Sequence, residues 1–277
     1  LKLYGSSHRE EELIACHLAD FCEEIKQTYG VDSFFMRYAD PKPHVRLRFH
    51  GESEKLYAIL PVVMEWSRGL LEADVIGDLA IVPYEREVER YGGIGLIEKA
   101  EQLFFADSTV VAQIIQNRRF QTVGMELEEI AAASVLFYVT GFYETLPEQL
   151  AFLEANYHDT IYEKEWKERK QRLITQLDIE TDWTGFCQSE DGSWLYPLWE
   201  NRKEAVIRYR EAMKGQVSNM EKNDIVASVL HLHCNRLLGT NRDLEQKVMT
   251  LAESVLYAKK YVLGKKGGYG TGKCEAS

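Results

Sequence analysis

The sequence predicts an α+β fold, with a small sheet near the N-terminus and helices over the rest of the chain. Over roughly the first 85 residues, short strand patterns and amphipathic helices alternate in the order β-α-β-β-α-β. From residue 94 onward, apolar residues recur mainly at helical spacing. No Pro-, Gly- or Ser-rich linker separates the two parts. We therefore expect one domain over residues 1–264, with a sheet-containing part over 1–93, a helical part over 94–264 and a flexible tail over 265–277.

The N-terminal part is predicted to form a ferredoxin-like βαββαβ sheet. A short strand over residues 1–4 precedes a helix over 9–29, whose apolar residues lie at helical spacing. The prolines of "DPKP" then interrupt strand pairing, so the segments on either side of that turn form a hairpin. A helix over 54–73 and a strand over 79–84 complete the pattern. Such a sheet carries its helices on one face.

The remainder is predicted as helices over residues 94–105, 108–118, 127–143, 147–157, 163–177, 224–238 and 242–263. Asp107 and Ser108 give a start signal for the second of these helices, and Asn241 gives one for the last. The segment 178–198 is rich in turn-forming and aromatic residues, so we expect an ordered loop or a short hairpin there.

Composition narrows the function classes. The chain has 33 Lys and Arg against 44 Asp and Glu, a net charge of −11, which disfavours a free-standing nucleic-acid binder. The five cysteines are scattered, without the spacing of a zinc site, and favour a reduced, cytoplasmic compartment. No apolar stretch is long enough to form a transmembrane segment.

The segment "PHVRLRFHG" places cationic side chains on one face of a strand. The two-residue period sends His44, Arg46 and Arg48 to one face, while the valine, leucine and phenylalanine between them face the helices. If "DPKP" is a four-residue loop, Arg37 lies opposite Arg46 and adds a third guanidinium. Like charges directly opposite each other destabilise a sheet unless an anion lies between them. The face is therefore either solvated beside acidic partners, or a binding site for a carboxylate or phosphate.

A second cluster, "PYEREVERYGG", follows the last strand of the sheet. Glu87 and Arg90 are three residues apart and share a face if the segment turns helically. Gly92 and Gly93 permit either a close backbone approach or a sharp change of chain direction. The segment is either a salt-bridged corner or part of a site at the end of a strand.

A third cluster, "SVLHLHCNRLLG", lies within a predicted helix. His231 and Asn235 are four residues apart and face the same way. A histidine on an apolar helix is more often a satisfied core residue than a catalyst, although histidine is the usual proton-transfer group near neutral pH. Two histidines two positions apart on a helix cannot easily bind one metal, so no metal site is predicted.

These three clusters occur in this order across nearly the whole chain, together with "LKLYG" at the start and "FFADS" after the glycine pair. As an ordered set they resemble the C-terminal elimination domain of class I lantibiotic dehydratases, also called the thiopeptide-type bacteriocin biosynthesis domain. Each motif alone is weakly specific, and the ordered set is much more so.

The resemblance implies a lyase of ribosomal peptide antibiotic biosynthesis. In that family, a separate larger domain uses glutamyl-tRNA to esterify Ser and Thr of a precursor peptide. The elimination domain then removes glutamate, which leaves dehydroalanine or dehydrobutyrine. The chain would be a split, small component of the dehydratase or an excised part of it. Its implied partners are the glutamylated peptide, the glutamylation component and a second copy of itself. Direct binding of tRNA is not expected, and no cofactor is implied.

Residue by residue, the resemblance implies five catalytic positions. The guanidiniums of Arg46, Arg48 and Arg90 would bind the glutamyl carboxylate and the developing oxyanion. Glu87 would orient an arginine or relay a proton, and His231 would transfer a proton. Supporting substrate-binding positions are Arg37, His44 and Asn235.

Two other functions stay open at this point. Relatives with the same fold join two dehydroalanines by a formal [4+2] cycloaddition to build a pyridine ring, although such a cyclase has no glutamyl carboxylate to hold. A non-catalytic subunit that binds the peptide or a partner is the third reading, and it predicts that single changes at Arg46 or His231 leave dehydration intact.

Overall fold

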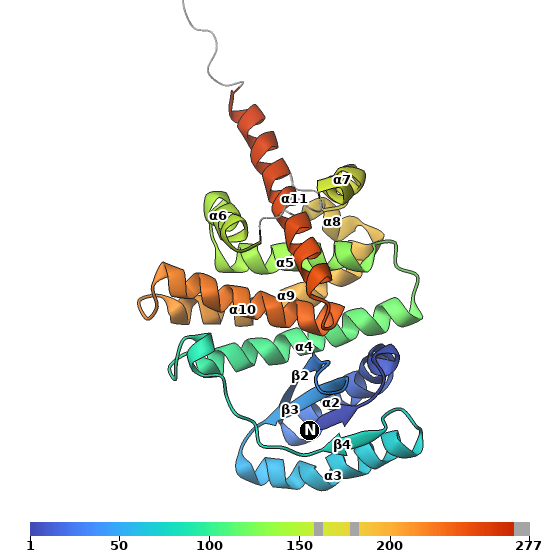
Figure 1. Ribbon diagram of the computed structural model, residues 1–277. Helices are drawn as coiled ribbons and strands as arrows, with labels where there is room; N and C mark the ends of the chain where they lie inside the picture. Colours follow the sequence, from blue (N-terminus) through green and yellow to red (C-terminus); the bar gives the residue numbers. More distant parts are fainter. Residues whose placement is uncertain (158–162, 178–182, 269–277) are drawn as a thin grey trace, which may run out of the picture. The chain divides into compact units, whose positions relative to one another are not determined.

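The computed structural model of the protein describes residues 1–157, 163–177 and 183–268 (Figure 1). Within them, the chain forms a four-stranded antiparallel sheet and many helices, which confirms the α+β class. Two compact units result: Leu1–Val123 with Leu198–Arg242, and Gly124–Pro197 with Asp243–Ser277. A single domain over 1–264 stays a prediction. In the predicted tail, residues 265–268 continue a helix and 269–277 lie outside the described residues.

The sheet belongs to the first unit. Its strands are β1 (Lys2–Tyr4), β2 (Asp32–Tyr38), β3 (His44–His50) and β4 (Asp78–Ala80). They lie in the order β2-β3-β1-β4, and all neighbours are antiparallel. The predicted sequence of strands and helices is present, although β4 is shorter than expected, and the ferredoxin-like assignment stays a prediction. β2 is an outer strand of the sheet, so one side of its backbone has no strand partner.

Helices on the face of Val45, Leu47 and Phe49 follow the amphipathic pattern. The predicted helix over 9–29 forms as the consecutive turns η1 (Ser7–Arg9), α1 (Glu10–Leu13), the π-helical η2 (Ile14–Leu18) and α2 (Ala19–Tyr29). α3 (Ser53–Glu72) connects β3 to β4. Apolar side chains of α2 and α3, including Phe21 and Ile59, pack in one cluster with Phe49. Each fully buried side chain of this size contributes about 1.5–3 kcal/mol.

A single helix, α4 (Ile97–Phe120), replaces the two helices predicted over residues 94–118. The start signal at Asp107 and Ser108 was wrong, because both side chains are buried inside the helix and contact other elements instead of capping a helix end. Figure 1 shows α4 on the opposite side of the sheet from α3. Both α4 and α10 (Asn219–Leu238) contact β2.

The predicted loop over 178–198 is wrong where the structure describes it. Residues 183–198 form α8 (Thr184–Gln188) and the start of α9 (Glu190–Met213), whereas 178–182 lie outside the described residues. The turn-forming residues mark a helix start, because Ser189 Oγ accepts a hydrogen bond from Gly192 N–H at 3.0 Å. A Cβ at Gly192 would lie 1.7 Å from the carbonyl oxygen of Phe186, so only glycine fits.

The second unit is helical where described. It contains α5 (Leu127–Phe142), α6 (Leu146–Tyr157), α7 (Glu163–Leu177), α8, the start of α9, and most of α11 (Arg242–Gly268). Asp191 accepts backbone hydrogen bonds from Gly124 N at 3.1 Å and Met125 N at 2.7 Å, which tie α9 to the segment before α5. In the described part of the chain, no helix combines the length and apolar character that crossing a membrane requires.

Candidate active site

The hairpin register decides which arginines share a face of the sheet. Residues 39–43 join β2 to β3, one residue more than the predicted loop. Arg37 therefore lies opposite Val45, and Met36 takes the place opposite Arg46. Since a shift of one residue sends a side chain to the other face, the prediction that Arg37 joins Arg46 and Arg48 was wrong.

Arg46 is held in place by two aromatic neighbours. Its guanidinium carbon lies 3.5 Å from the ring centre of Tyr38, and its Nε donates a hydrogen bond to His44 Nε2 at 3.0 Å. His44 Nδ1 lies 2.8 Å from the carbonyl oxygen of Lys42, so it carries the proton and donates there. Burial, aided by the charge of Arg46, lowers the pKa of His44. His44 is thus a neutral acceptor that orients Arg46.

Arg48 lies on the same face and contacts the segment that follows β4. Its guanidinium carbon is 4.1 Å from the ring centre of Tyr84 and 5.5 Å from that of Phe34. The segment is anchored to α4, because Arg86 donates to both carboxylate oxygens of the buried Glu101 at 2.9 and 2.6 Å. Tyr84 consequently stays over Arg48.

Glu87 and Arg90 form the ion pair that their spacing predicts. Arg90 Nη1 donates to Glu87 Oε2 at 2.9 Å, and the chain turns there into the 3₁₀ helix η3 (Glu89–Tyr91). Arg90 Nε also donates to Ser228 Oγ of α10 at 3.3 Å. These contacts connect Glu87, Arg90 and α10 within one unit.

The glycine pair after this segment uses the backbone freedom of glycine at both positions. Gly92 and Gly93 have φ values of +89° and +91°, a region that other residues rarely adopt. A Cβ at Gly92 would also lie 2.6 Å from Leu96 Cδ1 and 3.0 Å from Ile225 Cδ1. Gly92 thus allows the chain carrying Arg90 to approach α10.

His231 lies three residues after Ser228 on α10, so the two side chains project from neighbouring positions of one helix face. It is half-buried, and its Nδ1 lies 2.6 Å from Arg242 Nη1, at the start of α11. His231 and Arg46 belong to different elements, α10 and β3. The helix nevertheless brings it near the Glu87–Arg90 pair.

Arg37 and Asn235 contact each other instead of the arginine face. Asn235 pairs with the backbone of Arg37, and both side chains are buried. The Arg37 guanidinium lies 3.9 Å from the carboxylate of Glu10. These contacts hold β2 against its neighbours, and substrate binding by Arg37 and Asn235 stays a prediction.

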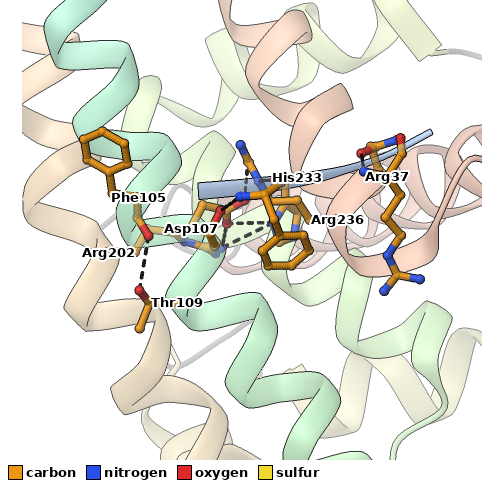
Figure 2. Close-up of polar contacts among 10 residues, drawn as sticks. Arg37, Phe105, Asp107, Thr109, Arg202, His233 and Arg236 are labelled. Atoms are coloured by element: carbon orange, nitrogen blue, oxygen red, sulfur yellow. Dashed lines mark hydrogen bonds and ion pairs between the residues drawn. The ribbon is translucent and has the colours of Figure 1, made fainter. Parts of the chain in front are cut away.

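Sequence reasoning missed a buried charge cluster around Asp107 (Figure 2). Asp107 Oδ1 accepts from Arg202 Nη1 at 2.7 Å and from His233 Nδ1 at 2.9 Å, and Oδ2 accepts from Arg236 Nη1 at 2.9 Å. The four residues come from α4, α9 and α10. Figure 2 also shows the Arg37 guanidinium pointing away from this cluster. Two features of the sequence could have indicated this cluster, namely an acidic residue within an apolar helix and the "HCNR" segment.

The charge states of the cluster follow from its geometry. Burial alone raises the pKa of Asp107, but His233, Arg202 and Arg236 outweigh it and hold the pKa well below its usual value. Burial lowers the pKa of His233, which therefore stays neutral and donates its Nδ1 proton to Asp107. One carboxylate thus neutralises part of the charge of two buried guanidiniums.

The same cluster closes the outer edge of β2. Ser108 Oγ accepts from Phe35 N–H at 3.1 Å, and Arg236 Nε donates to Phe35 O at 2.8 Å. Asn235 pairs with Arg37 further along the strand. Side chains of α4 and α10 therefore satisfy backbone groups that have no strand partner. This fixes α10, and with it His231, relative to the sheet.

A cavity of about 120 Å³ lies between η2, α2, β2 and α4. Its lining includes Cys22, Ser33, Phe35 and Ser108, and none of the eight predicted site residues. Among the described residues, no three His, Cys, Asp or Glu side chains gather so as to hold a metal ion.

Comparison with known families shows to which family this chain belongs. The sequence model of a family described as the lantibiotic biosynthesis dehydratase C-terminus matches residues 1–256. The chain belongs to this family. The predicted resemblance is thereby confirmed over nearly the whole length.

Curated relatives agree with this membership of the dehydratase C-terminal family. The chain is 42% identical over 262 residues to the subtilin biosynthesis protein SpaB of Bacillus subtilis, covering 94% of the chain and 25% of that protein. It is 25% identical over 265 residues to the nisin biosynthesis protein NisB of Lactococcus lactis subsp. lactis, covering 95% of the chain and 26% of that protein. The chain thus spans about a quarter of these relatives.

Solved structures share the fold of this dehydratase C-terminal chain. The tRNA-dependent lantibiotic dehydratase MibB from Microbispora sp. 107891 matches with a TM-score of 0.85 and 24% identity, over 96% of this chain and 28% of that one. The pyridine synthase TbtD from thiomuracin biosynthesis matches with a TM-score of 0.64 and 16% identity, over 94% and 98% respectively. At these identities the likeness concerns the fold alone.

Proposed function

We propose that the chain eliminates glutamate from glutamylated Ser and Thr residues of a precursor peptide. In this reaction a base takes the α-proton, and the electron pair of the C–H bond forms the Cα=Cβ double bond. The Cβ–O bond breaks, and glutamate leaves as a carboxylate with the bonding electrons. The products are dehydroalanine or dehydrobutyrine, free glutamate and the protonated base. Family membership supports a role in peptide dehydration, and the arginine face supports this step.

The observation that carries the proposal is the fixed guanidinium of Arg46. It is half-buried, stacked on Tyr38 and oriented by a neutral His44. A cation held in this way is ready to receive an anion without reorganisation. Arg48 lies next along the same face, and Arg90 is held by Glu87 and by Ser228 of α10. One donor of this kind typically lowers a reaction barrier by about 2.7–4 kcal/mol.

We assign roles from these contacts. Arg46, Arg48 and Arg90 bind the glutamyl carboxylate and the negative charge that develops on the peptide carbonyl oxygen. Glu87 orients Arg90 through their ion pair. His231 supplies a hydrogen bond or a proton from α10.

The supporting residues act behind this surface. His44 contacts Arg46 and the backbone of Lys42 through its two ring nitrogens, so we assign it to positioning Arg46. Arg37 and Asn235 hold β2 against α10. The sheet therefore keeps the arginine face in register with the helix that carries His231.

The proposed partners follow from the step itself. The substrate is a glutamylated peptide, so a separate glutamyl-tRNA-dependent activity has to supply it. The net charge of −11 disfavours direct tRNA binding by this chain. A homodimer, a cytoplasmic location and independence from cofactors stay predictions.

Mass spectrometry of a peptide carrying a glutamyl ester on Ser tests the proposal. The wild-type chain should convert it to the dehydroalanine product with release of glutamate, whereas Arg46→Ala and His231→Ala should leave the ester in place. Arg68→Ala serves as control, because Arg68 is an exposed residue of α3 paired with Glu65 and Glu72. An unchanged peptide with folded wild-type protein would refute elimination.

The cyclase is the second candidate, because the likeness to the pyridine synthase covers 98% of that chain. Incubation with a peptide that already contains two dehydroalanines separates the two activities. Pyridine formation without glutamate release would favour the cyclase. Full dehydration by a pathway that contains Arg46→Ala and His231→Ala protein would favour the non-catalytic subunit.

A further inference from the structure

The contact between His231 and Arg242 restricts the chemistry of the imidazole. Arg242 Nη1 lies 2.6 Å from His231 Nδ1. A guanidinium has only N–H donors, so Nδ1 must be the acceptor in this hydrogen bond. An imidazole that accepts through Nδ1 is neutral and carries its single proton on Nε2. The contact therefore favours one of the two neutral forms of His231.

The fold places Arg242 at this position through a short connection. α10 ends at Leu238, Gly239 adopts a φ of +84°, and α11 begins at Arg242 itself. Only residues 239–241 separate the two helices. The first side chain of the new helix reaches His231, eleven residues earlier in the sequence.

We propose that Arg242 is a positioning residue that holds His231 as an Nε2–H hydrogen-bond donor during elimination. The inference rests on the proposed function and specifies which ring nitrogen of His231 carries the proton. The donor would stabilise the negative charge that develops on the peptide carbonyl oxygen as the α-proton leaves. A neutral imidazole N–H can act in this way because it donates a hydrogen bond without giving up its proton.

The same geometry argues against His231 as the base. A base needs a lone pair on the nitrogen that faces the α-proton. In the form that Arg242 selects, the lone pair is on Nδ1 and already accepts a hydrogen bond, while Nε2 carries the proton. His231 could remove the α-proton only after losing the Arg242 contact. Another group therefore takes the α-proton.

NMR of the full chain labelled with ¹⁵N-histidine tests the first half of the proposal without any substrate. Spectra are recorded near pH 8.5, well above the ordinary imidazole pKa of about 6.5. His231→Gln identifies the signals of His231. The wild type should show the Nε2–H form, and Arg242→Leu should shift the population toward Nδ1–H. An Nδ1–H form in the wild type, or an unchanged population in Arg242→Leu, would overturn the proposal.

Arg208→Leu is the matched control for this experiment. Arg208 is an arginine of α9 paired with Glu204 four residues earlier, and it belongs to no part of the site. Its removal should leave the His231 signals unchanged. Arg242→Lys keeps a charged donor near Nδ1 and should retain more of the Nε2–H form than Arg242→Leu does.

Kinetics with the glutamylated peptide test the second half. Arg242→Leu should lower kcat about 100-fold, the order of loss caused by misplacing a reacting group by about 1 Å. KM should stay within about twofold, because Arg242 is not assigned to substrate binding. Arg242→Lys should recover part of kcat. A folded Arg242→Leu protein with wild-type kcat would refute the positioning role.

The two proposals fail in different ways. If the wild type shows the Nε2–H form but releases no glutamate, the proposed function is wrong and the catalytic role of Arg242 is lost with it. If the wild type releases glutamate while His231 carries its proton on Nδ1, elimination stands and only the Arg242 proposal is wrong.

Discussion

Asn235 hydrogen-bonds to both backbone polar groups of Arg37. Its Oδ1 accepts from Arg37 N–H at 2.9 Å, and its Nδ2 donates to the Arg37 carbonyl oxygen at 2.9 Å. One amide side chain thus supplies the donor and the acceptor that a neighbouring strand would supply. The contact joins the helix of His231 to the strand next to that of Arg46. Stability and activity should therefore depend together on Asn235.

Asn235→Ala should destabilise the protein by about 2–6 kcal/mol, because two buried backbone groups lose their partners at about 1–3 kcal/mol each. Urea unfolding followed by circular dichroism measures the change. Asn117→Ala is the control, since the Asn117 side chain makes a 3.3 Å contact with Gln121 on the helix surface. Equal losses in the two variants would contradict the bridging role of Asn235.

Asp107→Asn should cost about 3–5 kcal/mol, because it leaves two buried guanidiniums without their counter-charge. The expected result is a large drop in the thermal unfolding midpoint. Asp20→Asn, at an exposed position of α2, should change the midpoint little. A small effect at Asp107 would mean that the cluster is weakly coupled to folding.

Acidification should destabilise the fold in two stages. Burial lowers the folded-state pKa of His44 and of His233 below the value of about 6.5 expected for an unfolded chain. Between the folded and unfolded pKa values, the unfolded chain binds more protons, so the free energy of unfolding falls as the pH drops below that value. Asp107 has a depressed pKa, so its contribution is present above about pH 3.9 and is lost as the pH falls through its folded pKa.

Urea unfolding between pH 8 and 5 checks the first stage. Each histidine should contribute a slope of at most about 1.4 kcal/mol per pH unit. His44→Gln and His233→Gln should each make the dependence shallower, whereas His8→Gln, at an exposed position, serves as the control. A dependence that is unchanged in both buried variants would refute this origin.

Arg46→Lys should lose less elimination activity than Arg46→Gln. Lysine keeps the positive charge but loses the planar fork and the stacking on Tyr38, so we expect a loss in kcat/KM of about tenfold. The glutamine variant also loses the charge, and the expected loss is about 10²–10³-fold. Steady-state release of glutamate measures both, with Arg68→Lys as the surface control. Equal rates for the two variants would show that charge at this position is unimportant.

Gly92→Ala and Gly93→Ala form a matched pair. Both positions have positive φ, so both variants carry backbone strain of about 1–3 kcal/mol. Only at Gly92 would the new methyl group also meet side chains, those of Leu96 and Ile225. Gly92→Ala should therefore be the less stable and less active variant in parallel unfolding and elimination assays. The opposite order would contradict the close approach of this turn to α10.

The sequence predicts the parts of the fold that depend on local pattern. The alternation around Arg46, the spacing of Glu87 and Arg90, and the helix that carries His231 all follow from side-chain periodicity and appear in the structure. Arg37 was misplaced because its face depends on the length of one loop, which "DPKP" does not determine. A single residue more in that loop reverses the face.

The buried cluster could not be predicted because its partners are distant in sequence. Asp107 meets Arg202 and Arg236 across separations of 95 and 129 residues. The local sequence does not distinguish an acidic residue that neutralises buried arginines from one that caps a helix. Asp107 was therefore predicted to start a helix. Arg202 was not predicted as part of the cluster because α9 itself was not predicted. The Ser189 and Gly192 residues at the start of α9 are typical of loops as well as of helix starts.

The closed outer edge of β2 bears on how a precursor peptide is recognised. Extended peptides often bind by adding a strand to an open sheet edge, where backbone hydrogen bonds supply the affinity. At Phe35 and Arg37 those backbone groups are already occupied by Ser108, Arg236 and Asn235. A peptide cannot dock along β2 there without displacing α4 and α10. Recognition through the charged face would depend on the glutamyl group itself, and one site could then process Ser and Thr residues in different sequence surroundings.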